Sequence, residues 1–246
     1  MDWTFGIALL IGFVPVFIMM DTVMKNYTYP RVENPFFKDT TFFGLFTVGI
    51  VEGALIAVMI NFFGLLESPL AIIFMIMVAF IELMAMVVVL NLRRFRGKSD
   101  SIFYGYGLGL GMAGGMASGF VYLILMTAQA SEGEFGFDAT TAVISVILSF
   151  AMTLIFGSSG TNIGEGIARH IPMQFVMQAA IPLVAFNMIF AILPSTGGIV
   201  YIAALIFMLG IGAFFFYRNL MVNLPAIIRE VLKMNGEKRD DIPKAR

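Results

Sequence analysis

Cysteine is absent from the 246-residue chain, and histidine occurs once, as His170. Without cysteine there is no disulfide, no thiolate metal site and no cysteine nucleophile. A single histidine cannot build a histidine-rich metal cage, so we expect neither a metal nor any other cofactor in this chain. The formal net charge is −1, which argues against nucleic acid as a partner.

Charge of either sign is scarce. Only 13% of the residues are charged and 59% are hydrophobic, and the mean hydropathy is +0.93. Soluble globular domains carry about 25% charged residues, so this chain has too few charges to cover a surface that faces water. The composition therefore predicts an all-α, polytopic helical bundle in the cell membrane, with the lipid bilayer as its first partner.

Seven apolar segments are long enough to cross the bilayer, for which a helix needs about 20 residues. They cover residues 3–20, 41–65, 69–92, 102–128, 139–157, 173–193 and 197–217. The first segment lacks a basic leader and a small-residue cleavage site, so we interpret it as a span rather than a signal peptide. Residues 1–219 then form one transmembrane domain, followed by an amphipathic, basic tail over 220–246.

The tail begins with an amphipathic stretch. Its apolar residues recur at helical spacing from Leu220 to Leu232, and charged residues between Arg229 and Lys233 lie on the opposite face. This pattern fits a short helix that lies on the cytoplasmic leaflet. It fits equally well an extension of the seventh span into the cytosol.

The Lys and Arg residues orient the bundle. With the N-terminus outside, the cytoplasmic segments are 21–40, 93–101, 158–172 and 218–246, and together they hold all 15 Lys and Arg residues. The external segments hold only acids, which are Asp2, Glu67, Glu132, Glu134 and Asp138. Because cytoplasmic loops are enriched in Lys and Arg, we expect an external N-terminus and a cytoplasmic C-terminus. An extra or missing span would scatter the basic residues over both sides.

Two carboxylates and one amide lie inside predicted spans. Glu52 is midway along the second span and Glu82 midway along the third, and Asn187 follows Pro182 in the sixth. A charged side chain at the bilayer centre costs roughly 2.5–3.5 kcal/mol on insertion scales, so each acid should face a cavity, contact a partner or carry a proton. These residues are candidates for a proton carrier, a metal ligand or a substrate contact. The alternative is a neutral acid that is hydrogen-bonded to a neighbouring helix.

The fourth predicted span carries a glycine face. Four glycines recur every four residues and lie on one side of the helix, namely Gly107, Gly111, Gly115 and Gly119. Small residues in this spacing, as in GxxxG motifs, let a second helix approach closely. We expect a second helix to pack on this face. That helix can belong to a membrane-protein partner or to a second copy of the chain in a homo-oligomer.

Residues 157–166 are small, polar and glycine-rich. We interpret them as a flexible connection that borders the membrane on the cytoplasmic side, since such a composition is typical of loops. The alternative is that they line a cavity, to which Asn162 and Glu165 would contribute an amide and a carboxylate.

The order of these features resembles the PrsW-type intramembrane proteases over about residues 30–190. The likeness lies in an aromatic and proline-containing stretch, a segment around Glu82, a basic loop, and a span rich in glycine and tyrosine. These segments are residues 27–35, 80–85, 93–96 and 103–113. The resemblance implies a helical membrane fold in which Glu82, Glu52 and Asn187 are the candidate catalytic residues.

The departures from that family fall on its catalytic positions. Where the family has a Glu-Glu-x-x-Lys motif, this chain has Ile81, Glu82 and Ala85, and a later Glu and His of the family fall near Met116 and Leu183. A metalloprotease needs several metal ligands and a base that activates water. We therefore expect a protease-like scaffold, a pseudoprotease, that does not cleave peptide bonds.

Three functions stay open. The first is a non-catalytic membrane protein that binds a partner, a helix or a lipid in a lateral cavity, in an assembly, adaptor or regulatory role. Glu52, Glu82, Asn187 and the glycine face of the fourth span would line that cavity. The second is a divergent intramembrane metalloprotease that uses Glu52, Glu82, and Glu165 or His170. The third is a small transporter in which the two intramembrane acids carry a proton or a cation.

Overall fold

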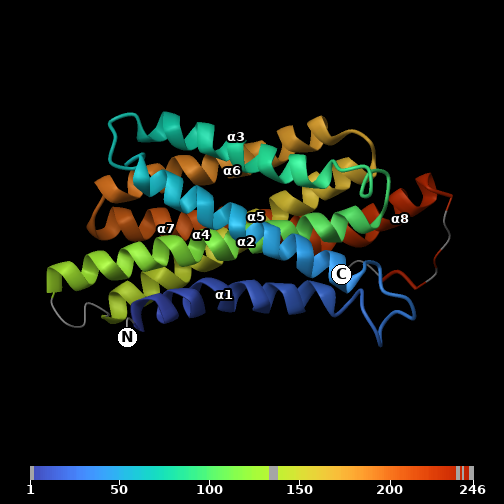
Figure 1. Cartoon of the computed structure of the whole chain (residues 1–246), viewed down its shortest axis with the longest axis horizontal. Helices are drawn as coiled ribbons and strands as arrows, with labels where there is room; N and C mark the ends of the chain where they lie inside the picture. The colour runs from blue at the N-terminus through green and yellow to red at the C-terminus, as the bar shows by residue number, and fades with distance from the viewer. Residues whose placement is uncertain (1–2, 133–137, 237–238, 240, 244–246) are drawn as a thin grey trace.

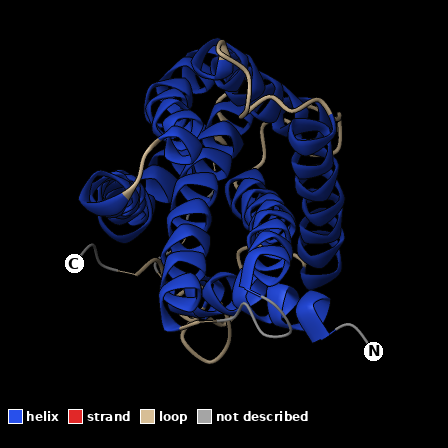
Figure 2. Ribbon diagram, turned by 90° about the vertical axis from the view of Figure 1, so that its left-hand side faces the viewer, coloured by secondary structure: helices blue, strands red, loops and turns tan. Residues whose placement is uncertain are grey.

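The computed structural model describes the backbone of residues 3–132, 138–236, 239 and 241–243. The helices are α1 (Trp3–Met24), α2 (Asp39–Phe62), α3 (Ala71–Leu90), α4 (Asp100–Glu132), α5 (Ala139–Ala168), α6 (Pro172–Ile192), α7 (Gly198–Phe216) and α8 (Leu224–Met234). A 3₁₀ turn, η1 (Leu193–Ser195), precedes α7, and a π-helical segment, η2 (Tyr217–Asn223), joins α7 to α8. Figure 2 shows helices and short loops, with no strand among the described residues.

Seven of these helices are long and apolar enough to cross a membrane. They run side by side along the long axis of the molecule, and the N-terminus lies at the opposite end from α8 (Figure 1). Each of the seven predicted spans coincides with one helix, so the predicted all-α fold with seven helices of membrane-spanning length is confirmed. The architecture is that of a multi-pass membrane protein.

Helix α4 is the central element of the bundle. It packs against α1, α2 and α5, and its residues from Ser101 to Ser118 are all buried. On the other side of the molecule α3 packs against α6, and α7 packs against α5. Because α4 contributes so many glycines, three neighbouring helices can approach its backbone closely.

The glycine face of α4 is covered by α2. A Cβ atom on Gly111 would collide with the carbonyl oxygen of Phe46, and one on Gly115 with that of Ile50. The approach is reciprocal, since a Cβ on Gly53 of α2 would collide with the carbonyl oxygen of Met112. The face is therefore filled within the chain. Helix α2 thus occupies the side of α4 on which the sequence placed a membrane-protein partner or a second copy.

The glycine-rich segment 157–166 is helical and buried, not a flexible connection. Helix α5 continues through it to Ala168. A Cβ on Gly160 would collide with the carbonyl oxygen of Gly105, so this stretch is the part of α5 that lies closest to α4. The hydroxyl of Thr161 is compatible with burial, since its Oγ1 donates to the carbonyl of Gly157 at 2.8 Å. The loop prediction was wrong because small polar residues here serve close helix packing.

The amphipathic stretch of the tail extends the seventh span. One helical run continues from Gly198 to Met234, with the π-helical turn inside it, so residue 219 lies within the helix. Ile228 and Val231 are fully buried in the core cluster. The apolar face of α8 thus packs against the protein, and of the two alternatives the structure favours the extension over the leaflet-bound helix.

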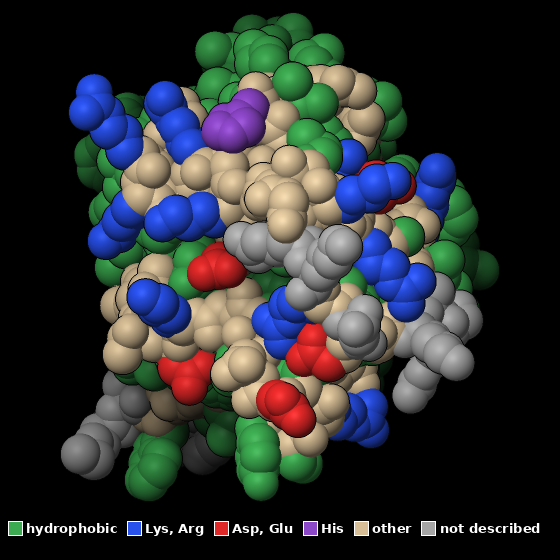
Figure 3. Space-filling model, turned by 90° about the vertical axis from the view of Figure 1, so that its right-hand side faces the viewer, with side chains coloured by type: hydrophobic (Ala, Val, Ile, Leu, Met, Phe, Trp, Pro, Cys, Tyr) green, Lys and Arg blue, Asp and Glu red, His purple; other side chains and the backbone are tan. Residues whose placement is uncertain are grey.

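The four segments predicted to be cytoplasmic meet at one end of the bundle. Asn235 Nδ2, after α8, donates to the carbonyl of Gly97 in the α3–α4 loop at 2.9 Å. Arg239 Nη2 donates to the carbonyl of Asn34 in the α1–α2 loop at 2.5 Å. Figure 3 shows Lys and Arg side chains gathered on this end around the single histidine, with a few acids among them. Of the acids predicted for the other end, Asp2 and Glu134 lie outside the described residues.

Candidate functional site

The structure separates the residues that the sequence grouped into one cavity. Glu82 and Asn187 lie between α3 and α6. Glu52 lies on α2, the helix that covers Gly107, Gly111 and Gly115 of α4. Asn162 and Glu165 lie near the C-terminal end of α5, where η2 and α8 pass. The glycine face lines no cavity, because α2 fills it.

Glu82 and Asn187 form a buried hydrogen-bonded pair. Asn187 Nδ2 donates to Glu82 Oε2 at 2.9 Å, and the two side chains are 1% and 0% exposed, respectively. Glu82 Oε1 has no hydrogen-bond partner among the described residues. A neutral carboxylic acid fits this apolar interface better than a carboxylate, because none of the ion pairs among the described residues includes Glu82. The pair links α3 to α6.

Glu52 is half-buried on α2, and its Oε2 atom is buried without a hydrogen-bond partner among the described residues. Glu52 and Glu82 therefore each have one carboxyl oxygen without a hydrogen-bond partner among the described residues. In the described part of the chain, no group of three or more His, Asp or Glu side chains lies close enough to hold a metal ion.

A polar cluster connects α5 with η2. Asn219 Nδ2 donates to Ser158 Oγ at 2.8 Å and to Asn162 Oδ1 at 3.0 Å. Asn219 belongs to the π-helical turn, and π-helical turns occur frequently at functional sites. Here the wider turn brings an amide from the seventh span against the small polar face of α5.

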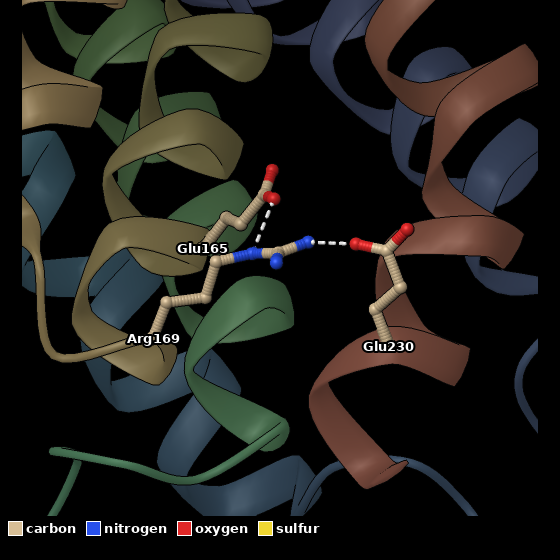
Figure 4. A network of polar contacts seen from close by, with 3 residues as sticks. All are labelled: Glu165, Arg169 and Glu230. Carbon is tan, nitrogen blue, oxygen red and sulfur yellow. Dashed lines mark hydrogen bonds and ion pairs between the residues drawn. The ribbon is translucent and has the colours of Figure 1, made fainter. Parts of the chain in front are cut away.

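At the C-terminal end of α5, Arg169 binds two acids (Figure 4). Its Nε donates to Glu165 Oε1 and its Nη2 to Glu230 Oε2, both at 2.7 Å. Burial acts to lower the pKa of Arg169, but its hydrogen bonds and charge interactions with Glu230 and Glu165 outweigh burial, so the pKa lies above its usual range. Arg169 therefore stays charged and holds α8 against α5. Glu165 serves this contact, whereas the sequence proposed it for a cavity.

An apolar hollow lies at the other end of the bundle, where the sequence predicted nothing. A cavity of about 510 Å³ opens between α2, α4, α5, α6 and α7. Its inner wall is apolar and buried, and consists of Ile60, Phe120, Leu148, Phe190 and Leu193. The rings of Phe120 and Phe190 meet edge to face with their centroids 4.8 Å apart. Ligand sites of proteins have volumes of about 300–1,000 Å³ and mostly apolar walls.

Polar groups lie at the outer part of this cavity. They are Asn61, Glu67, Thr127 and Tyr201. Asn61 and Glu67 are exposed, and Gly64 between them turns the chain with a φ of +58°, which glycine adopts without strain. The only signal for this site in the sequence was the polar Asn61 at the end of an apolar span.

No family model, no curated protein and no solved structure matches this chain. The likeness to the PrsW-type proteases therefore stays a prediction from the order of features in the sequence.

Proposed function

We propose that this protein is a non-catalytic, multi-pass protein of the cell membrane that binds the apolar chain of a membrane amphiphile in the 510 Å³ cavity. On this proposal the protein has a PrsW-like scaffold and does not cleave peptide bonds. It serves as an assembly, adaptor or regulatory factor, and the amphiphile occupies its cavity. The N-terminus is outside and the C-terminus is in the cytoplasm.

The distribution of basic residues supports the orientation. The segments that gather at the α8 end carry all 15 Lys and Arg residues of the sequence. Cytoplasmic loops retain Lys and Arg because translocation of positively charged loops is disfavoured. The cavity then opens toward the external leaflet, because it lies at the end opposite α8.

The observation that carries the proposal is the division of the cavity into an apolar inner wall and a polar outer part. An aliphatic chain in contact with Phe120, Leu148 and Phe190 leaves its polar head near Asn61 and Glu67. Of the described residues that line the cavity, Glu67 alone carries charge. The head should therefore carry an ammonium or hydroxyl groups, since an isolated anion would meet only a carboxylate.

Size distinguishes a lipid chain from a partner helix. A spanning helix about 10 Å wide and about 30 Å long occupies roughly 2,400 Å³. The cavity holds about 510 Å³, which is far too small for a helix and suits a single chain. Of the three occupants that the sequence left open, a lipid-like amphiphile is the best fit.

The test is quenching of tryptophan fluorescence by a brominated chain. Trp3 is the only tryptophan, so Trp3→Phe removes the background, and Tyr201→Trp then places one reporter in the cavity. Ile202→Trp on the same helix is the control, because Ile202 is 52% exposed and does not line the cavity. The titrant is a lysolipid with a brominated acyl chain and an ethanolamine headgroup, added to nanodiscs of unbrominated lipid.

We expect saturable quenching of the cavity reporter at low mole fractions, where the control is quenched only in proportion to the brominated lipid present. An anionic glycerol headgroup on the same chain should bind more weakly. Equal, unsaturable quenching of both reporters would mean that the cavity holds no specific chain.

A second function is favoured by the unsatisfied carboxyl oxygens of Glu52 and Glu82. An intramembrane acid without a fixed partner can take up a proton or a cation, as in small transporters. Reconstituted protein should then show proton-coupled flux that Glu52→Gln abolishes. Flux that persists in Glu52→Gln and in Glu82→Gln would remove this alternative and leave the amphiphile proposal intact.

A further inference from the structure

The α3–α4 loop, residues 91–99, carries four cations and no acid. Arg93, Arg94, Arg96 and Lys98 are all exposed, directly after the end of α3 at Leu90. Since α3 and α4 are both membrane-spanning helices, this short connection lies at the level of the lipid headgroups. Leu92, in the same loop, exposes 49% of its surface and can enter the apolar part of the leaflet.

The backbone of this loop is held in place by several contacts. Phe95 is 2% exposed, and its ring lies 5.5 Å from that of Tyr104. Gly97 N donates to the carbonyl of Ile167 at 3.1 Å, and its φ of +70° is a left-handed conformation that favours glycine. A Cβ atom there would also clash with the ring of His170. The loop is thus fixed before any ligand arrives.

Two of the guanidinium groups are oriented by the protein. Arg96 Nε donates to the backbone oxygen and to Oδ1 of Asn91, both at 2.8 Å, which leaves its terminal N–H groups for another acceptor. The Arg94 guanidinium lies over the ring of Phe95, 4.5 Å from the centroid. A planar guanidinium with fixed stem suits bidentate binding of phosphate oxygens.

The loop cations differ from Arg169 and Arg239 at the same end of the bundle. Arg169 is neutralised by Glu165 and Glu230, and Arg239 by Asp241. None of the ion pairs among the described residues includes a cation of the α3–α4 loop. This loop therefore holds four cations without a recognised ion pair, two of which, Arg94 and Arg96, are oriented by contacts within the loop.

We propose that the α3–α4 loop binds the phosphate groups of anionic lipids in the leaflet at the α8 end of the bundle. Clusters of basic residues next to a membrane span attract anionic headgroups. The headgroup level of the loop and the exposed Leu92 favour a lipid over a soluble phosphate. This site is separate from the cavity, which lies at the other end, and it does not depend on the occupant of that cavity.

The test compares lipid binding by four proteins, which are the wild type and three charge variants. The delipidated full chain in detergent is titrated with phosphatidylglycerol or phosphatidylcholine, and bound lipids are counted by native mass spectrometry. The loop variant is R93Q/R94Q/R96Q. The matched control is R218Q/R229Q/K233Q, which removes the same charge from exposed positions at the same end of the bundle. A further variant, R93Q/R94Q, keeps the contact of Arg96 with Asn91 in case the triple change disturbs the loop.

We expect the wild type and the control to prefer phosphatidylglycerol, and the loop variant to bind it roughly tenfold more weakly with phosphatidylcholine binding unchanged. The double variant should show a smaller loss in the same direction. An equal loss in the control would assign the preference to general surface charge and overturn the proposal. Exclusion of the lipid by inorganic phosphate at constant ionic strength would assign the site to a soluble anion, which also overturns it.

Discussion

Glu82 and Asn187 show how one hydrogen bond accounts for two polar residues in an apolar interface. Asn187 donates to Glu82 at 2.9 Å between α3 and α6, and both side chains are buried. The sequence marked both residues as unusual, because polar groups inside spans are rare. It could not show that they bind each other, because they are 105 positions apart.

Removal of either partner should destabilise the bundle. We expect Glu82→Leu and Asn187→Leu to lower the free energy of unfolding in detergent, with a coupling energy in the double mutant of about 0.6–1.7 kcal/mol. Glu82→Gln should keep most of the stability, since an amide can also accept from Asn187. Strictly additive effects of the two changes would show that the hydrogen bond contributes nothing.

Asp138 gives the stability of one helix end a dependence on pH. Its carboxylate accepts from Thr141 N at 2.7 Å at the start of α5, and hydrogen bonds from Thr141 hold the pKa of Asp138 below its usual range. The stabilisation is therefore complete above the ordinary aspartate pKa of about 3.9. It is lost as the pH falls through the lower pKa of the folded protein.

Hydrogen exchange at the Thr141 amide should reveal this loss. We expect its protection, corrected for intrinsic exchange, to fall as the solution is acidified below about pH 4. Asp138→Asn caps the helix without titrating, so its protection should not change with pH in that range. The same acid-dependent loss in Asp138→Asn would point to another group.

At the scale of helices, the sequence predicted which helices exist better than it predicted where each helix ends. Long apolar runs predicted all seven spans, because a helix is the only way for a single segment to satisfy its backbone in lipid. The same reasoning ended α5 too early, at residue 157, since Gly and Ser residues are typical of loops. Contact with Gly105 on α4 decides that Gly160 is helical, and no local pattern reports such a contact.

The packing of α4 on α2 predicts a sharp difference between glycines. Gly111→Ala should destabilise the protein by about 1–3 kcal/mol, because the new methyl collides with the carbonyl of Phe46. Gly44→Ala, on α2, has no atom within 4 Å of its added Cβ and should be neutral or slightly stabilising. Thermal unfolding of the two variants in one detergent provides the comparison. Equal stability of both would contradict the close approach of α2 and α4.

For the whole molecule, the distribution of charge predicts which side of the membrane each end occupies. The chain lacks cysteine, so single substitutions can be labelled without background. Ser195 lies between α6 and α7, and Ser99 lies between α3 and α4. In intact cells, an impermeant thiol reagent should label Ser195→Cys, and it should label Ser99→Cys only after the membrane is opened. The reverse pattern would invert the proposed orientation.

The cavity is a property of the whole molecule, and this explains why the sequence did not predict it. Ile60, Phe120 and Phe190 each belong to an apolar run that reads as ordinary lipid-facing or core sequence. Their arrangement around one hollow depends on the relative placement of three helices. Charge patterning and hydrophobic length carry no such information.

The most direct test of the proposed binding function is a count of co-purified amphiphile in a variant with a filled cavity. Leu123→Trp places a larger side chain in the cavity. Leu55→Trp makes the same change at a surface position, since Leu55 is 64% exposed. Extraction and mass spectrometry of each purified protein give the amount retained. We predict one retained amphiphile per wild-type chain and per Leu55→Trp chain, and a loss of most of it in Leu123→Trp. Equal retention by all three proteins, or none by the wild type, would contradict the proposed function.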